Sequence, residues 1–181
     1  MTDNEECQNL ISKSYETLNP ADLTGSTEQA WLYGFKQLSK EWFNARYLSI
    51  GGSVICAVLG QSRFQTKEEA IAGLIAPSSV VLNEAMLRGT VGETYIRDFV
   101  SKKLGINIIE IGMAVKKNAP WMRASPDGIY ILPDNKYGIF EAKTVSSRSR
   151  RVPFDQTLID LRNGNPTFST ILPEHYHQIH Y

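Results

Sequence analysis

Apolar and polar positions alternate most clearly in the second half of the chain. Between residues 82 and 104 apolar side chains recur every three or four positions and Gly105 follows, a pattern that predicts a long helix with a glycine stop. The apolar run of residues 106–115 predicts a strand buried on both faces. Residues 129–132 and 138–145 are strand-like runs separated by turn formers, which predicts a β-hairpin.

The first half of the chain gives a mixed picture. Residues 1–25 are polar without a sustained period, so we expect a loose helix or a disordered lead-in. Apolar positions from residue 26 to 48 recur at helical spacing and predict one or two helices. A Gly-Gly-Ser corner ending at Ser53 precedes an apolar stretch, which predicts a short buried helix with Ser53 as its N-cap. Thr66 and Glu69 form a capping-box pattern at the start of the next helix.

Composition limits the class of protein. The chain has 181 residues, 42% hydrophobic and 21% charged, which fits one globular domain with its own core. Basic and acidic residues balance at 19 each, so a nucleic-acid surface has to come from local clustering of charge. Two cysteines are too few for a disulfide framework or an iron-sulfur cluster. The acidic start and the lack of a long apolar run predict an intracellular protein, cytoplasmic or nuclear, without a membrane segment.

The predicted hairpin carries the most informative chemistry. Asp127 lies in a Ser-Pro-Asp-Gly corner before its first strand, and Glu141 and Lys143 interrupt its second. Side chains two residues apart on a strand share a face, so we expect Glu141 and Lys143 to point the same way. An isolated Glu-x-Lys is most often a surface pair. The corner one hairpin length upstream instead favours a Mg²⁺ site with a nearby ammonium group.

Three other features carry alternatives. Glu93 lies within the predicted long helix and could be a simple solvated carboxylate. The run that contains Arg148, Arg150 and Arg151 is either a solvated loop or a contact for backbone phosphates. All three histidines fall within residues 175–180, but their spacing matches no tight zinc-ligand pattern.

Together, these motifs resemble those of the PD-(D/E)XK nuclease superfamily. They are more closely similar to the group that contains phage lambda exonuclease and the YqaJ-type viral recombinases, also called viral alkaline exonucleases, over roughly residues 42–181. The motifs that carry the resemblance are W-x3-R-x3-(I)-G-(G/A)-S at Trp42 to Ser53, R-G-x2-G-E ending at Glu93, S-P-D-G at Ser125 to Gly128, E-A-K at Glu141 to Lys143, and Y-H-Q ending at Gln178. The chain departs from the family in having Gly52 where Ala is common, and it lacks the helix and strands that normally follow the glutamine.

The resemblance implies an α/β (α+β) fold with a restriction-endonuclease-like core, a central mixed β-sheet flanked by helices. Residues 26–181 would form the nuclease domain after the polar lead-in. The implied activity is that of a Mg²⁺-dependent exonuclease, with Mn²⁺ as a substitute, that degrades one strand of double-stranded DNA 5′ to 3′ during recombination or replication of a virus or mobile element. The implied partners are duplex ends with a 5′-phosphate and a single-strand annealing protein, and the implied assembly is a homotrimer.

Residue roles also follow from the resemblance. Asp127, Glu141 and the backbone carbonyl of Ala142 would ligate metal, and Glu93 would ligate a second metal or orient water. Lys143 would polarise or deprotonate the attacking water, and Gln178 would position Lys143 or the scissile phosphate. Residues that would contact the 5′-phosphate or the DNA are Arg46, Ser53, Ser125, Arg148, Arg150 and Arg151.

Two alternatives to an exonuclease remain open from the sequence. The first is an endonuclease of restriction or repair type on the same fold, which would cut circular DNA. The second is a catalytically silent DNA-binding module, which would bind neither Mg²⁺ nor Mn²⁺ through Asp127.

Overall fold

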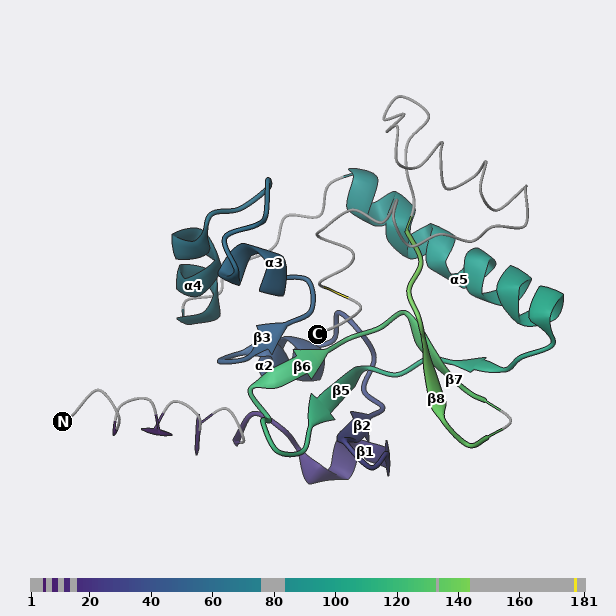
Figure 1. The fold of residues 1–181 in the computed structure, drawn as a ribbon, viewed down its shortest axis with the longest axis horizontal. Coiled ribbons are helices and arrows are strands. Elements are labelled where there is room, and N and C mark those ends of the chain that lie inside the picture. The colour runs from purple at the N-terminus through teal and green to yellow at the C-terminus, as the bar shows by residue number, and fades with distance from the viewer. Residues whose placement is uncertain are drawn as a thin grey trace.

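The computed structural model describes residues 16–75, 84–132, 134–143, Gln178 and five positions nearer the N-terminus (5, 8, 9, 12 and 13). Figure 1 shows α5 along one side of the molecule and the short helices α3 and α4 on the opposite side of the strands. The predicted helix start at Pro173, the arginine run and the histidines lie outside the described residues.

Two β-sheets form the centre of the fold. The larger is mixed, has the strand order β1-β2-β5-β6-β3, and is antiparallel except where β3 runs parallel to β6. The smaller is antiparallel, with the order β4-β7-β8. The strands are β1 (Leu23–Ser26), β2 (Ala30–Tyr33), β3 (Ile50–Gly51), β4 (Ile108–Ile109), β5 (Met113–Lys116), β6 (Met122–Ala124), β7 (Gly128–Ile131) and β8 (Tyr137–Phe140).

The predicted hairpin is confirmed as β7 and β8. Gly128 pairs with Phe140 at its open end and Ile131 with Tyr137 near its turn. Asn135 occupies the turn with a positive φ of 63°, which asparagine tolerates better than most residues. The second strand is shorter than expected, because β8 ends at Phe140. Glu141 and Lys143 therefore follow the strand instead of interrupting it.

Four helices and one 3-10 turn flank these strands within the described residues. The long helix predicted for residues 82–104 is confirmed as α5, and Gly105 ends it with a φ of +66°. The capping box at α4 is confirmed, because the Thr66 and Glu69 side chains each accept a hydrogen bond from the other residue's backbone N–H. The bounds are η1 (Pro20–Asp22), α2 (Lys40–Arg46), α3 (Ile55–Val58), α4 (Lys67–Ile75) and α5 (Glu84–Leu104). No described helix combines the length and apolar character that a membrane span requires.

The expectation for the N-terminal part was wrong in two places. Residues 23–26, placed partly in the polar lead-in, form β1, and Ala30–Tyr33, read as helical, forms β2. Only Lys40–Arg46 is helical between residues 26 and 48. The aromatic side chains of β2 fit both a helix and a strand locally. Pairing with β5, 80 to 86 residues away, decides the strand.

Two further local expectations need correction. The run of residues 106–115 is two short strands in different sheets, since β4 pairs with β7 whereas β5 pairs with β2 and β6. Ser53 is not an N-cap, because the cap of α3 is Val54 and makes no side-chain hydrogen bond. With four residues, α3 is also too short to offer the N-terminal anion site that a longer helix has.

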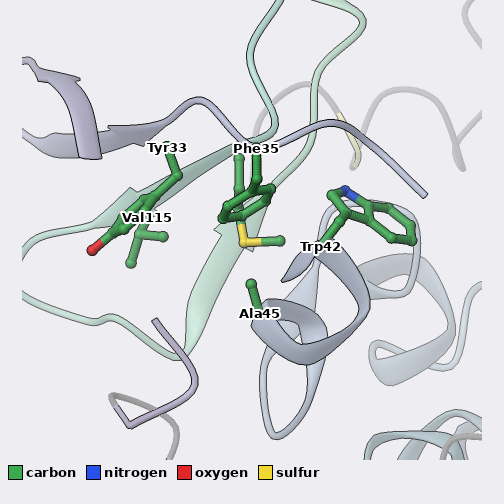
Figure 2. Close-up of a cluster of buried hydrophobic side chains, with 6 residues drawn as sticks. Tyr33, Phe35, Trp42, Ala45 and Val115 are labelled. Carbon is green, nitrogen blue, oxygen red and sulfur yellow. The ribbon is translucent and has the colours of Figure 1, made fainter. Parts of the chain in front are cut away.

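The larger sheet has hydrophobic contacts on both faces because side chains alternate along its strands. One cluster joins β2 and β5 to helix α2, and Figure 2 shows Trp42 and Ala45 of α2 facing the aromatic and aliphatic side chains of the sheet. The other joins the opposite face of the same strands to β7 through Leu32, Ala114 and Ile129. These two layers fix α2 and the hairpin relative to each other.

Candidate active site

The open end of the hairpin brings two carboxylates into register. Since Gly128 pairs with Phe140, the next residues outward, Asp127 and Glu141, flank the same position of the ladder. The backbone N–H of Ala142 donates to Asp127 Oδ2 at 2.6 Å. This bond fixes Asp127 against the chain segment that carries Glu141.

Glu141 is held by two side chains. The Lys143 ammonium lies 2.5 Å from Glu141 Oε1, which confirms that these two residues point the same way. The amide Nε2 of Gln178 donates to the same oxygen, so Gln178 contacts Glu141 rather than Lys143. The Glu141 side chain is only 11% exposed, whereas that of Lys143 is 38% exposed. Lys143 is thus the member of this group that solvent and substrate can reach.

Glu93 of α5 belongs to the same electrostatic cluster. Its pKa is raised first by burial and then by the charges of Asp127 and Glu141, against the opposing charges of Lys143 and Arg97. The pKa of Asp127 is raised by burial despite the hydrogen bond from Ala142. Burial also raises the pKa of Glu141, although Lys143 and Gln178 oppose it. Three carboxyl groups with raised pKa values at one place are typical of functional sites.

The donor set fits a hard divalent cation. Mg²⁺ is usually bound by one or two carboxylates and keeps several waters. Asp127 Oδ2 and Glu141 Oε1 accept hydrogen bonds, and within the described part of the chain the second oxygen of each carboxylate has no hydrogen-bond partner, so it could bind a cation. Among the described residues, no group of three or more His, Cys, Asp or Glu side chains is placed so that it could hold a metal ion. A cation bound by Asp127 and Glu141 would therefore take its other ligands from water or from backbone oxygens.

Arg97, one turn after Glu93 on α5, connects the helix to the corner that holds Asp127. Its Nη1 donates to the backbone carbonyl of Asp127 at 3.3 Å, and its Nη2 lies 3.3 Å from Glu110 Oε2. No role for Arg97 was predicted from the sequence. Its position four residues after Glu93 was the available signal, because such residues share a helix face.

A second group gathers around Arg46. Its Nη2 donates to Ser53 Oγ at 3.3 Å, and its guanidinium carbon lies 4.5 Å from the centre of the Trp42 ring. The Trp42 Nε1–H donates to Ser125 Oγ at 2.9 Å. Arg46, Ser53 and Ser125, three of the residues predicted to contact the 5′-phosphate or the DNA, are thus brought together around Trp42.

One cavity joins the two groups. It has a volume of about 720 Å³, and its lining includes Arg46, Ser53 and Ser125 of one group and Glu141 and Gln178 of the other. The predicted contacts Arg148, Arg150 and Arg151 lie outside the described residues, so their relation to this cavity remains a prediction.

Comparison with known proteins shows which families and solved structures this chain is similar to. A family model described as the YqaJ-like viral recombinase domain matches residues 41–178. Two crystal structures of an alkaline exonuclease, LHK-Exo from Laribacter hongkongensis and LHK-Exo in complex with dAMP, share 24% identity and superpose with TM-scores of 0.55 and 0.56. Each match covers 77% of this chain and 64% or 65% of the LHK-Exo chain, so the chain spans about two thirds of that length. No curated protein sequence matches significantly.

The likeness to these structures confirms the predicted fold class, a mixed β-sheet with flanking helices on the alkaline exonuclease pattern.

Proposed function

The chain belongs to the YqaJ-like viral recombinase domain family, and on this premise we propose that it is a Mg²⁺-dependent exonuclease that degrades one strand of double-stranded DNA from its 5′ end. The observation that carries this proposal is the cluster of Asp127, Glu141 and Lys143 at the open end of the hairpin. Glu141 of this cluster lines the same cavity as the Arg46 group, which is suited to a terminal phosphate.

The carboxylates would hold the cation. Asp127 and Glu141 would contribute oxygens, with the Ala142 carbonyl as a further ligand and Glu93 orienting water or a second ion. When bound, the cation would act as a Lewis acid on the scissile phosphate and lower the pKa of a bound water. Gln178 holds Glu141 through its hydrogen bond to Oε1, and the other oxygen of Glu141 would bind the cation.

Lys143 would act on the substrate directly. Its ammonium is the partly exposed cation beside Glu141, and it can donate to an attacking water or to a non-bridging phosphate oxygen. In the hydrolysis, the water oxygen bonds to phosphorus and the bond from phosphorus to the 3′ oxygen breaks. The released nucleotide keeps a 3′-hydroxyl, and the shortened strand keeps a 5′-phosphate.

Because the bond from phosphorus to the 3′ oxygen breaks, the Arg46 group would act in every catalytic cycle. Each cleavage produces a new strand end with a 5′-phosphate, the group that Arg46 would recognise. A guanidinium and two hydroxyl groups are chemically suited to a phosphate monoester. Exonuclease polarity would therefore follow from anchoring the terminal phosphate in the cavity that Glu141 also lines.

The test is digestion of a linear duplex with 5′-phosphates, labelled at the 5′ or the 3′ end, with and without Mg²⁺. We expect Mg²⁺-dependent release of 5′-labelled mononucleotides and a loss of at least about a hundredfold in rate for Glu141→Ala. Glu68→Ala is the matched control, because Glu68 is an exposed carboxylate in the first turn of α4. An active Glu141→Ala protein would refute the assignment.

Two additions separate the alternative functions. Cutting of covalently closed plasmid would identify an endonuclease. Calorimetric titration with Mg²⁺ and Mn²⁺ that shows no binding dependent on Asp127 would identify a silent DNA-binding module. The same proposal includes a homotrimer and a single-strand annealing protein as partner, which light scattering and co-purification would test.

A further inference from the structure

Trp42 contacts two of the residues that surround the proposed phosphate position, Arg46 and Ser125. It lies one helical turn before Arg46 on α2, so the two side chains share a face. The guanidinium of Arg46 lies over the indole ring at 4.5 Å, within the range of a cation-π contact. On its other edge, the indole N–H donates to Ser125 Oγ at 2.9 Å.

These contacts determine what the neighbouring hydroxyl groups can do. A serine hydroxyl has one hydrogen to donate and two lone pairs to accept with. Ser125 Oγ accepts from Trp42, and Ser53 Oγ accepts from Arg46. Among the described residues neither hydroxyl donates a hydrogen bond, so each can donate its hydrogen to an anion.

The charge of Arg46 fits the same ligand. Among the described residues Arg46 forms no ion pair with a carboxylate, and burial lowers its pKa. A partly desolvated guanidinium that rests on an aromatic ring gains most from a hydrogen-bonding anion. Arg46, Ser53 and Ser125 all line the cavity that Glu141 also lines, so an anion held there could be reached by all three side chains.

Ser125 also belongs to the corner that carries Asp127. Between them, the carbonyl of Pro126 accepts a hydrogen bond of 2.9 Å from Gln37 Nε2, which fixes the corner from a second side. A displacement of Ser125 would be transmitted to Asp127 through one intervening residue. The hydrogen bond from Trp42 therefore connects the phosphate position to the metal-binding carboxylate.

We propose that Trp42 is a positioning residue that orients Arg46 and Ser125 for a terminal 5′-phosphate and links its binding to the Asp127 corner. The inference rests on the proposed function of the same site. It assigns Trp42 a part in selecting phosphorylated ends, beyond its packing in the core cluster.

The experiment compares Trp42→Phe and Trp42→Leu with the wild type. Binding of blunt duplexes with a 5′-phosphate or a 5′-hydroxyl is measured in EDTA, so that no cleavage is needed. We expect the affinity ratio of phosphate to hydroxyl ends to fall about fivefold in Trp42→Phe, which keeps a ring but loses the N–H donor. In Trp42→Leu, which also loses the cation-π contact, the ratio should fall by about tenfold or more.

Control variants separate positioning from packing. Phe43→Leu removes an exposed ring that stacks edge-on against Trp42 at 5.0 Å, and it should lower the melting temperature without changing the ratio. Ser125→Ala should lower the ratio as Trp42→Phe does, and the double variant should add little, because both remove one hydrogen bond. An unchanged ratio in folded Trp42→Phe and Trp42→Leu proteins would overturn the inference.

The binding ratio also distinguishes this inference from the proposed function. A wild-type protein that prefers phosphorylated ends through Trp42 but cleaves nothing would support the inference and refute the nuclease. A protein that cleaves from 5′ ends, but whose affinity ratio does not depend on Trp42, would support the nuclease and refute the inference.

Discussion

At the scale of single residues, the three carboxyl groups of the site are costly to ionise. Burial is the largest cause of the raised pKa of Glu93, of Asp127 and of Glu141. An acid whose pKa is higher in the folded than in the unfolded state destabilises the fold when it is ionised. A cation bound between these groups would offset that cost, so metal affinity and fold stability should be coupled.

Glu93→Gln should make the protein more stable at alkaline pH in EDTA. The raised pKa of Glu93 means that its ionisation lowers stability as the pH rises through the folded-state pKa, and below the ordinary glutamate pKa both states are protonated. Glutamine keeps the size and removes the charge. We expect a gain of roughly 2 °C in melting temperature at pH 8 that shrinks towards pH 4, measured by calorimetry.

Glu84→Gln, at an exposed position in the first turn of α5, is the control for a change of charge on the same helix. A gain in melting temperature for Glu93→Gln that is the same at pH 4 and pH 8 would contradict the electrostatic explanation. Mg²⁺ should raise the melting temperature of the wild type more than that of Glu93→Gln.

At the scale of elements, the site depends on how α5 meets the hairpin. Arg97 is the described side chain of α5 that bonds the Asp127 corner directly, through the Asp127 carbonyl, while it also pairs with Glu110 before β5. Its side chain is 16% exposed, whereas that of Glu110 is 61% exposed. The bond to the Asp127 carbonyl is therefore the better shielded of its two contacts.

Arg97→Gln should reduce the proposed nuclease activity by about tenfold, because one hydrogen bond from a charged donor to the Asp127 corner is lost. Arg97→Lys keeps the positive charge but lacks the two guanidinium nitrogens that contact the Asp127 carbonyl and Glu110. We expect it to recover only part of the activity. Mg²⁺ affinity measured by calorimetry provides a readout independent of turnover, and it should weaken in Arg97→Gln.

Glu110→Gln is the matched control, since it removes only the exposed ion pair, which is worth little. Its activity should stay within about twofold of the wild type. If Glu110→Gln and Arg97→Gln lose activity equally, the bond to Asp127 is not the reason.

Whether a helix or strand could be predicted from the sequence depends on whether a local pattern or a distant pairing determines it. The hairpin and α5 are specified by local patterns, and both were predicted correctly. By contrast, β2 and the division of residues 106–115 depend on pairings between distant strands, which no local period contains. Ser53 lost its predicted capping role because α3 begins two residues later.

The contacts of the candidate site could likewise be predicted only where the two residues are close in the sequence. The contact of Glu141 with Lys143 could be predicted because the two residues are neighbours on one face. The contacts of Trp42 with Ser125 and of Arg97 with Asp127 span 83 and 30 positions of the sequence. Their roles therefore emerge only when the chain is folded.

At the scale of the whole molecule, the formal net charge of zero limits how the chain can hold DNA. A neutral protein gains little from long-range attraction to a polyanion, so affinity must come from a few local cations. Arg46 and Lys143 lie in or beside the proposed catalytic cavity. The arginine run that follows Lys143 in the sequence is the strongest further concentration of positive charge.

Replacement of Arg148, Arg150 and Arg151 by alanine should weaken duplex binding without altering the preference for a 5′-phosphate. If each arginine contacts one phosphate, the slope of log affinity against log salt concentration should become shallower by about 2 to 3, since each neutralised phosphate contributes roughly 0.9. Fluorescence anisotropy from 50 to 200 mM salt measures this slope. Lys102→Ala with Lys103→Ala, at the end of α5, tests whether any loss of positive charge has the same effect. An equal change in slope per charge in both variants would attribute binding to net charge, whereas a change confined to the arginine variant would place the DNA along the segment that leaves Lys143.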